Sequence, residues 1–353
     1  MKIKPIHKDM NDKELIERIK KIKKELGKEL VLLAHHYQRK EIVYLADYSG
    51  DSFELSRKAA EDNDARFIVF CGVNFMAESA EILSQPHQTV QLPDLEAGCW
   101  MANMADVSII DEAWEQAVSV TGEDVITPVV YMNADAVIKN FCGNNGGIVC
   151  TSSNTPNAFK WSLKRREKIF FFPDKHLGRN TANKMGIPPE EVIIWNPETP
   201  FGGNTKEAIK KAKIILWEGY CLVHTRFQVE DISRMRNKFP DAKIVVHPEC
   251  PQEIVGKADA AGSTSFIVNY VDQAPAGSTI IIGTEINLID RLAHEYTDKQ
   301  ILPLKDSLCP NMFKINLANL LWTLENAGNV NIIKISDQIK KGAKKALDRM
   351  LTL

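Results

Sequence analysis

The most constraining feature of this sequence is a series of short apolar runs, each of which ends abruptly in polar residues. The runs at 29–38 and 243–250 both pass from aliphatic residues directly into histidine. A buried parallel strand that delivers side chains at its carboxyl end has this pattern. Further runs of this kind, separated by helix-like and often lysine-rich segments, lie at 66–72, 126–133, 146–154, 168–176, 191–195, 265–271 and 278–285. Strands that alternate with helices predict βαβ units and parallel sheets, which is the α/β class.

Two other segments are expected to form a helix and a loop. Residues 8–28 are highly charged and place apolar residues at helical spacing, which predicts an amphipathic helix. The apolar stripe of this helix is made of Leu15, Ile16, Ile19, Ile22 and Leu26. The segment 197–204 is rich in proline and glycine and is expected to be a loop.

Composition excludes several classes of protein. Lys plus Arg is 44 and Asp plus Glu is 46, so the formal net charge of −2 gives no general attraction to nucleic acid or anionic membrane. The apolar runs fall far short of the ~20 residues that span a bilayer, and the charged start of the chain lacks the apolar core of a signal peptide. Seven dispersed cysteines argue against a disulfide framework. We therefore expect a cytoplasmic protein.

An internal repeat organises the chain. Four landmarks recur three times in the same order: a strand ending in polar residues, a small hydroxyl cluster, a strand that breaks into a helix, and one cysteine. The strand ends lie at 34–37, 130–133 and 246–249, the hydroxyl clusters at 50–52, 151–153 and 262–264, and the cysteines are Cys99, Cys221 and Cys309. The middle copy is longer, chiefly through 183–219. Chance recurrence in an α/β chain is the alternative to a true repeat. If the copies are real, their strand ends should meet at one cavity, because ligands in open α/β sheets bind beyond the carboxyl ends of the strands.

The three repeated cysteines are candidate metal ligands. Iron–sulfur clusters normally take four thiolates, so three would leave one iron open as a Lewis acid. Buried packing is the alternative role for a cysteine, and it is the preferred interpretation for Cys71, Cys142 and Cys150, which lie in or beside apolar runs. Cys250 directly follows a polar strand end and can be mistaken for a ligand.

Candidate acid–base and binding residues surround the same strand ends. His247 and Glu249 are two residues apart, so an extended backbone projects both side chains to one side. Together they are a usable acid–base pair or, alternatively, a surface ion pair. His35 and Tyr37 share a face in the same way, and His224 follows Cys221 closely enough to support a metal ligand. The hydroxyl clusters can receive anions at helix N-termini or serve only as N-caps.

Taken together, these residues resemble the quinolinate synthase family of de novo NAD (pyridine nucleotide) biosynthesis, from Ala34 to about Asn326. The segments that carry the resemblance lie at 34–52, 71–83, 92–99, 129–133, 150–154, 171–178, 221–227, 245–250, 262–265, 283–285 and 309–312. The resemblance implies three similar three-layer α/β/α units with short parallel sheets around a pseudo-threefold axis. We expect an N-terminal helix and the first unit in 1–105, the second unit in 106–222, and the third unit with the C-terminal helices in 223–353.

The resemblance also implies the chemistry. One [4Fe–4S] cluster per chain is expected on Cys99, Cys221 and Cys309. The implied reaction condenses iminosuccinate (iminoaspartate) with dihydroxyacetone phosphate, and releases phosphate and water to give quinolinate. Implied catalytic residues are Glu249, His247, Tyr37, Tyr131 and His224. Implied substrate contacts are His35, Ser52, Tyr131, Asn133, Ser152, His247, Glu249 and Thr264. An L-aspartate oxidase or dehydrogenase is the expected supplier of the imine.

Two other functions remain open at the level of sequence. A zinc-dependent hydrolase or lyase can use the same three cysteines with a water as fourth ligand. A non-catalytic binding protein for dicarboxylates would need the hydroxyl clusters but no metal chemistry. Metal and sulfide content separates the first of these from an iron–sulfur enzyme, and turnover separates the second.

Overall fold

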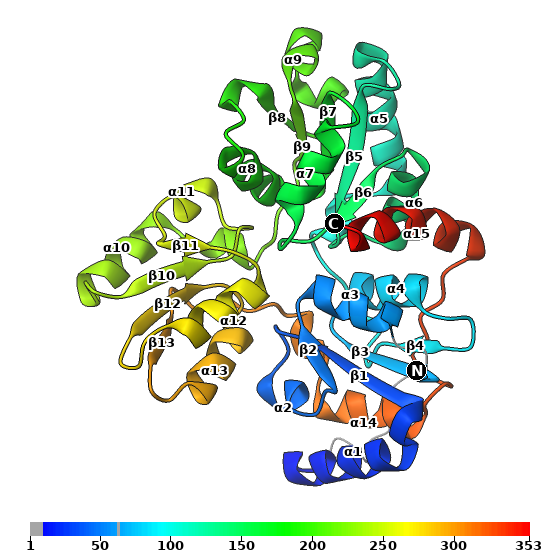
Figure 1. Cartoon of the computed structure of the whole chain (residues 1–353), viewed down its shortest axis with the longest axis vertical. Helices are drawn as coiled ribbons and strands as arrows, with labels where there is room; N and C mark the ends of the chain where they lie inside the picture. The colour runs from blue at the N-terminus through cyan, green and yellow to red at the C-terminus, as the bar shows by residue number, and fades with distance from the viewer. Residues whose placement is uncertain (1–9, 62–63) are drawn as a thin grey trace.

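The computed structural model describes residues 10–61 and 64–353, and these residues form three lobes around a common centre (Figure 1). Each lobe is built on one sheet, and all strand pairs that are hydrogen-bonded within these sheets are parallel. The α/β class and the parallel sheets predicted from the alternating runs are therefore confirmed.

The first and third sheets have the same strand order. It runs second, first, third, fourth along the chain, as β2-β1-β3-β4 and as β11-β10-β12-β13. The first lobe contains α1 (Asp12–Leu26), η2 (Gly27–Glu29), β1 (Leu30–His35), α2 (Lys40–Val43), β2 (Tyr48–Gly50), α3 (Ser52–Glu61), β3 (Phe67–Cys71), α4 (Asn74–Leu83), β4 (Thr89–Gln91) and η3 (Ala102–Met104). The third contains η6 (His224–Arg226), α10 (Val229–Lys238), β10 (Lys243–Val246), α11 (Gln252–Val255), β11 (Ala260–Ala261), α12 (Thr264–Gln273), β12 (Thr279–Gly283), α13 (Ile286–Glu295), β13 (Gln300–Pro303) and η7 (Met312–Lys314).

The middle sheet repeats this order with one strand added. Its order is β6-β5-β7-β9-β8, so β9 takes the fourth position and β8 lies beyond it at the edge. The extra length noted at 183–219 therefore supplies an edge strand and its connections. The lobe contains α5 (Val107–Thr121), β5 (Ile126–Tyr131), α6 (Ala136–Asn144), β6 (Ile148–Cys150), α7 (Thr155–Leu163), β7 (Lys168–Phe172), α8 (Lys175–Lys184), η4 (Pro189–Glu191), β8 (Val192–Trp195), η5 (Pro200–Gly203), α9 (Lys206–Lys211) and β9 (Ile214–Trp217).

The two C-terminal helices return to the first and second lobes. Helix α14 (Leu317–Glu325) packs on α1 and β3, and α15 (Asp337–Leu351) packs on α6, β6 and α4 (Figure 1). One continuous apolar core consequently joins the first two lobes to both helices. The third lobe has separate cores on the two faces of its sheet. The unit boundaries expected after residues 105 and 222 fall in connections between the sheets, and the division into domains stays a prediction.

One expected strand is wrong. Residues 265–271 belong to helix α12, not to a strand. The run is rich in β-branched and aromatic residues, which favours a strand by composition. However, Ser263 caps the helix by accepting the N–H of Phe266. The buried residues Thr264, Ile267 and Val271 recur at intervals of three and four, and this helical period decides the structure.

Several strands escaped prediction because they are short. They are β2, β4, β9, β11 and β13. The four residues of β9 are fully buried yet follow directly on the lysine-rich helix α9, so no long apolar run announces them. The expected loop at 197–204 is confirmed as an irregular segment containing η5.

The expected N-terminal helix is confirmed as α1, with Leu15 and Ile19 buried. The first two residues of the predicted range 8–28 lie outside the described residues, as does His7. Within residues 10–61 and 64–353, no helix combines the length and the apolar character that crossing a bilayer requires.

The contact between α6 and α15 generates a stability prediction. These helices cross at two glycines, and a Cβ on Gly143 would lie 1.9 Å from the carbonyl oxygen of Gly342. We expect Gly143→Ala to lower the free energy of unfolding by ~1–3 kcal/mol, because backbone atoms must move apart. Gly98→Ala is the control, since nothing lies within 4 Å of its added Cβ. Urea unfolding measures both, and equal stability of the two variants would show that this crossing tolerates a methyl group.

Candidate active site at the junction of the three lobes

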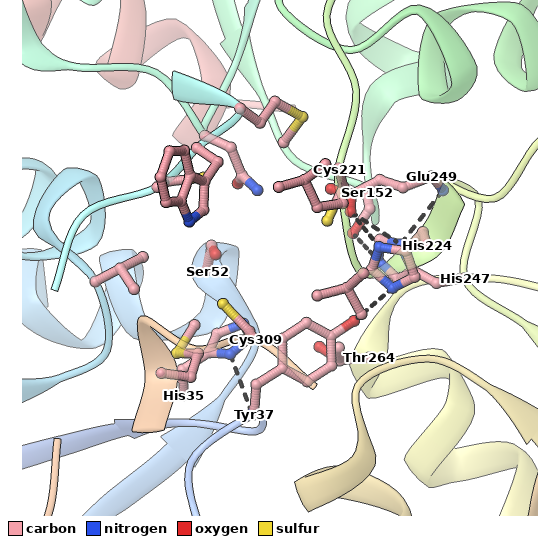
Figure 2. Close-up of a pocket in the computed structure, with 18 of the residues that line it drawn as sticks. His35, Tyr37, Ser52, Ser152, Cys221, His224, His247, Glu249, Thr264 and Cys309 are labelled. Carbon is pink, nitrogen blue, oxygen red and sulfur yellow. Dashed lines mark hydrogen bonds and ion pairs between the residues drawn. The ribbon is translucent and has the colours of Figure 1, made fainter. Parts of the chain in front are cut away.

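The carboxyl ends of all three sheets open onto one cavity of about 530 Å³. Every site residue predicted from the sequence lines this cavity, and Figure 2 shows how ten of them lie around it. The predicted residues that line it are His35, Tyr37, Ser52, Cys99, Tyr131, Asn133, Ser152, Cys221, His224, His247, Glu249, Thr264 and Cys309. The structure thus brings together groups that lie up to 274 positions apart in the chain, from His35 to Cys309.

The first strand of each sheet ends in a pair of lining residues spaced by two. These pairs are His35 and Tyr37, Tyr131 and Asn133, and His247 and Glu249. In two of the lobes the backbone repeats one hydrogen bond: the N–H of Tyr37 donates to Nδ1 of His35 at 3.2 Å, and the N–H of Glu249 donates to Nδ1 of His247 at 3.3 Å. A neutral imidazole that accepts at Nδ1 carries its proton on Nε2. For His247, the Nε2 nitrogen lies 3.3 Å from the hydroxyl oxygen of Ser152.

The second strand of each sheet leads to a hydroxyl-bearing turn. Ser52 and Thr264 are the first residues of α3 and α12, while Ser152 lies in the turn before α7. Free N–H groups at helix starts attract anions. The turns also tie the lobes together: the hydroxyl of Ser153 donates to Asp51 at 2.8 Å, and that of Ser265 donates to Glu54 at 2.7 Å. Hydroxyls and helix starts from all three lobes therefore lie in one connected layer.

The three cysteines follow the fourth strand of their sheets and begin the same turn. The carbonyl of each accepts the N–H four positions later, at 3.1 Å for Cys99, 3.1 Å for Cys221 and 3.3 Å for Cys309. A 3₁₀ helix starts three positions after each of them. The backbone N–H at that third position hydrogen-bonds each sulfur. These N–H groups favour a thiolate.

Ionisation of the three thiols nevertheless needs a cation. Burial raises the pKa of Cys99 to about 12, and it also raises the pKa of Cys221 and Cys309. Each thiolate would also repel its neighbours, since Cys309 raises the pKa of Cys99 and both of them raise that of Cys221. A bound metal removes these penalties, because coordination deprotonates a thiol outright.

The acid–base groups form a compact buried cluster. Nδ1 of His224 lies 2.6 Å from Oε2 of Glu249, and the rings of His224 and His247 stack at 4.5 Å (Figure 2). Burial would raise the pKa of Glu249, but the neighbouring imidazoles and a hydrogen bond with Tyr131 hold it below its usual value. Burial, together with the adjacent His224, lowers the pKa of His247 to about 3. The cluster thus combines an ionised carboxylate with a neutral imidazole.

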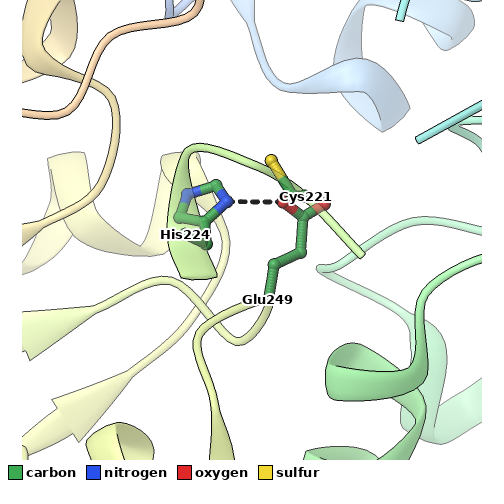
Figure 3. Close-up of side chains that lie close together, drawn as sticks. All are labelled: Cys221, His224 and Glu249. Carbon is green, nitrogen blue, oxygen red and sulfur yellow. Dashed lines mark ion pairs between the residues drawn. The ribbon is translucent and has the colours of Figure 1, made fainter. Parts of the chain in front are cut away.

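Cys221, His224 and Glu249 are together capable of holding a metal ion. Their ligand atoms lie within 4.8 Å of one another (Figure 3). Two ligand atoms on one tetrahedral zinc are ~3.3 Å apart, which is longer than the 2.6 Å between His224 and Glu249. The arrangement seen here is therefore a close buried pair of side chains, tighter than joint coordination of one zinc ion would allow.

Several buried groups beside the cavity escaped sequence reasoning. Thr284 bonds both Tyr37 and His224. Glu285 accepts the N–H of Cys309 at 3.2 Å. Asp174 caps α8 and is fully buried; burial, and then Glu249, raise its pKa well above the usual range. These residues directly follow β7 and β12, which are the third strands of their sheets. This position could have been noticed in the sequence, but it does not by itself indicate a function for the residue.

The described cysteines and histidines that were not predicted as site residues lie outside the cavity lining. Cys71, Cys142, Cys150 and Cys250 are buried and absent from the cavity lining, and the seven cysteines, all in the described part of the chain, form no disulfide. His36 points away and contacts Arg291 at 3.1 Å. The histidines left unassigned that the structure describes, His87, His176 and His294, do not line the cavity.

Comparison with known proteins gives one family. The family model described as quinolinate synthetase A protein matches residues 17–352. A quinolinate synthase of Corynebacterium glutamicum is 49% identical over 97% of this chain and 88% of its own length. A quinolinate synthase of Acidobacterium capsulatum is 48% identical over 97% of this chain and 94% of its own length. Another, of Listeria monocytogenes, is 46% identical over 99% of this chain and 96% of its own length. The matched range includes every residue that lines the cavity.

Acid should destabilise the fold through His35 and His247. Burial lowers their pKa to about 4 and about 3, whereas the unfolded chain binds these protons near pH 6.5. The unfolded state therefore binds more protons in this window, and the free energy of unfolding falls as the pH falls, by up to ~1.4 kcal/mol per pH unit for each ring. Urea unfolding between pH 6.5 and 4 should show a smaller slope for His247→Asn. The exposed His294→Asn serves as control, and a slope unchanged in both variants would contradict the buried neutral imidazole.

Proposed function

The chain belongs to the quinolinate synthase family and is an enzyme with small-molecule substrates, and we propose that it condenses iminosuccinate with dihydroxyacetone phosphate. The products would be quinolinate, phosphate and water. The observation that carries the proposal is the convergence of three cysteines and one carboxylate–imidazole cluster on a single cavity. The names of the relatives support this reaction rather than a zinc hydrolase or a dicarboxylate-binding protein.

The cofactor we propose is one [4Fe–4S] cluster held by Cys99, Cys221 and Cys309. The donor set fits such a group, because the three thiols line one cavity and each begins the same turn with an N–H directed at its sulfur. Hydrogen bonds of this kind to ligand sulfurs are among the features that tune iron–sulfur clusters. With three protein thiolates, the bound cluster supplies one open iron as a Lewis acid.

In this proposal, uncharged hydrogen-bond donors bind the substrates. The hydroxyls of Ser52, Ser152 and Thr264 would hold carboxylate and phosphate oxygens together with helix N–H groups. Asn133 and the Nε2–H of His35 would complete the set, since both line the same cavity. Exclusion of bulk water during turnover would limit hydrolysis of the imine.

Proton transfer falls to the buried cluster. Glu249 is the proposed base, because it is ionised and its carboxylate is held by His224. Nε2 of His247 would donate to a substrate oxygen. Burial, followed by the charge of Glu249, raises the pKa of Tyr37 and of Tyr131 well above 10, so both phenols stay protonated as donors.

We further propose a cytoplasmic enzyme that receives its imine from an L-aspartate oxidase or dehydrogenase. Seven cysteines without a disulfide in the described part of the chain fit a reducing compartment. Nucleic acid and membrane are not proposed as partners, in keeping with the balanced charge of −2.

Metal analysis tests the cofactor. Anaerobically purified protein is expected to hold about four irons and four sulfides per chain, the content of the proposed cluster. Cys99→Ala, Cys221→Ala and Cys309→Ala should each lose most of the iron and the visible absorption of the cluster. Cys250→Ala is the matched control, since Cys250 is buried but absent from the cavity lining. One zinc and no sulfide in the unaltered protein would refute the cluster.

Substitution of the proposed base tests the reaction. We expect Glu249→Gln to lower kcat by ~10²–10⁴, because the amide keeps the shape of the side chain but cannot take a proton. The absorption spectrum of the cluster should stay the same, since Glu249 is not one of the proposed ligands. Quinolinate is measured after supplying both substrates. Full activity in this variant would place the base elsewhere.

A further inference from the structure

Lys139 is a fully buried lysine that takes no part in the proposed chemistry. It belongs to helix α6 of the second lobe and does not line the cavity. Its ammonium donates hydrogen bonds to two carbonyl oxygens, that of Ala134 at 2.6 Å and that of Phe75 at 3.2 Å. Ala134 lies in the second lobe, whereas Phe75 is the second residue of α4 in the first lobe. One buried cation therefore joins two lobes.

Both carbonyl groups belong to segments that lead into the site. The acceptor in the second lobe directly follows Asn133, which lines the cavity. In the first lobe, Phe75 itself lines the cavity, and the N–H of Asn74 before it donates to the carbonyl of Ala97 at 2.8 Å. Ala97 lies two positions before Cys99. The ammonium is thus placed between a strand end with a proposed substrate contact and the helix start that holds the loop of a proposed cofactor ligand.

The surroundings of the ammonium show why a cation suits this place. The carboxylate of Glu78 on α4 accepts the N–H of Ala136 at 2.7 Å, so a second hydrogen bond joins the same helix to the same connection. Burial lowers the pKa of Lys139 to about 8, while Glu78, Asp135 and an ionised Cys99 act to raise it. The side chain is therefore mostly protonated at neutral pH. A charged donor makes stronger hydrogen bonds to carbonyl oxygens than a neutral donor does.

We propose that Lys139 is a positioning residue that holds the Cys99 loop in a fixed place relative to the substrate-binding end of β5. The inference rests on the proposed function for the roles of Cys99 and Asn133. Because these two groups come from different lobes, their relative position depends on the contacts between the lobes. Such placement matters for rate, since a displacement of ~1 Å can cost ~10²-fold. Lys139 acts through the backbone and touches neither substrate nor cofactor in this proposal.

Hydrogen–deuterium exchange of the full chain, kept anaerobic, tests the proposal without turnover. Lys139→Met keeps most of the length of the side chain but removes its charge and its donors. We expect exchange to become roughly fivefold faster in the peptides that cover 72–80 and 95–105, because the start of α4 and the Cys99 loop lose their attachment to the second lobe. Peptides from the third lobe should exchange as before.

Lys168→Met is the matched control. Lys168 is also buried in the second lobe, and its ammonium likewise donates to two carbonyl oxygens, those of Lys210 and Ala212, each at 2.6 Å. Both acceptors belong to the same lobe as Lys168, and none of the three residues lines the cavity. Unchanged exchange in Lys139→Met, an increase spread evenly over all lobes, or the same local increase in Lys168→Met would overturn the positioning role.

A second variant keeps the test decisive if Lys139→Met does not fold. Glu78→Ala removes only the hydrogen bond to Ala136 and should speed exchange in the same two peptides to a smaller extent. Unchanged exchange in this variant would then overturn the proposal.

Iron release connects the inference to the proposed cofactor. In protein that holds the cluster, Lys139→Met should lose iron to a chelator roughly fivefold faster than Lys168→Met, because one ligand loop is less firmly held. Equal rates of loss would contradict the role of Lys139 at the Cys99 loop. Unaltered protein that holds no iron would refute the proposed cofactor, whereas the exchange experiment would still decide whether Lys139 fixes the loop.

Discussion

The geometry of parallel strands is the constraint on which the rest of this structure depends. A parallel sheet sends all its carboxyl-end loops to one edge, so three such sheets facing a common centre bring loops from every lobe to one cavity. Each lobe supplies one residue pair, one hydroxyl turn and one cysteine, from the ends of its first, second and fourth strands. None of the lobes holds a complete site. The site therefore forms only where the lobes meet. Helix α15 packs on α4 of the first lobe and α6 of the second, and so stabilises the contact between these two lobes.

Buried thiols link this geometry to a cofactor. Without a cation, the cysteines stay protonated because burial raises the pKa of each thiol. Their turns nevertheless direct N–H groups at sulfur, an arrangement that stabilises negative charge. The two features are reconciled if the thiols are built to ionise only on a metal. Binding then releases protons and connects three lobes through one group, so affinity for the cofactor and stability of the assembled site are coupled.

Sequence reasoning correctly predicted which residues meet at one cavity where those residues hold the same position in each copy of the repeat. Cys99, Cys221 and Cys309 share no local motif, yet each follows a fourth strand, and the order of landmarks located them. It failed where two local signals disagreed, as in α12, whose strand-like composition hides a helical period. The strand β9 was missed because four buried residues leave no periodicity to detect. Thr284 was invisible for another reason, since its value lies in contacts with Tyr37 and His224, which only the folded chain supplies.

The cavity would offer the anionic substrates of the proposed reaction mostly uncharged hydrogen-bond donors rather than fixed cations. Among the described lining residues, Arg226 is the one with a permanent positive charge, and it lies exposed at the rim. Deeper in, burial keeps His35 and His247 neutral, so oxyanions meet hydroxyls, imidazole N–H groups and helix starts. Such neutral donors hold an anion more weakly than a fixed cation does. In the proposed reaction, this weaker binding would let phosphate leave, while specificity would come from donor positions set by three separate lobes.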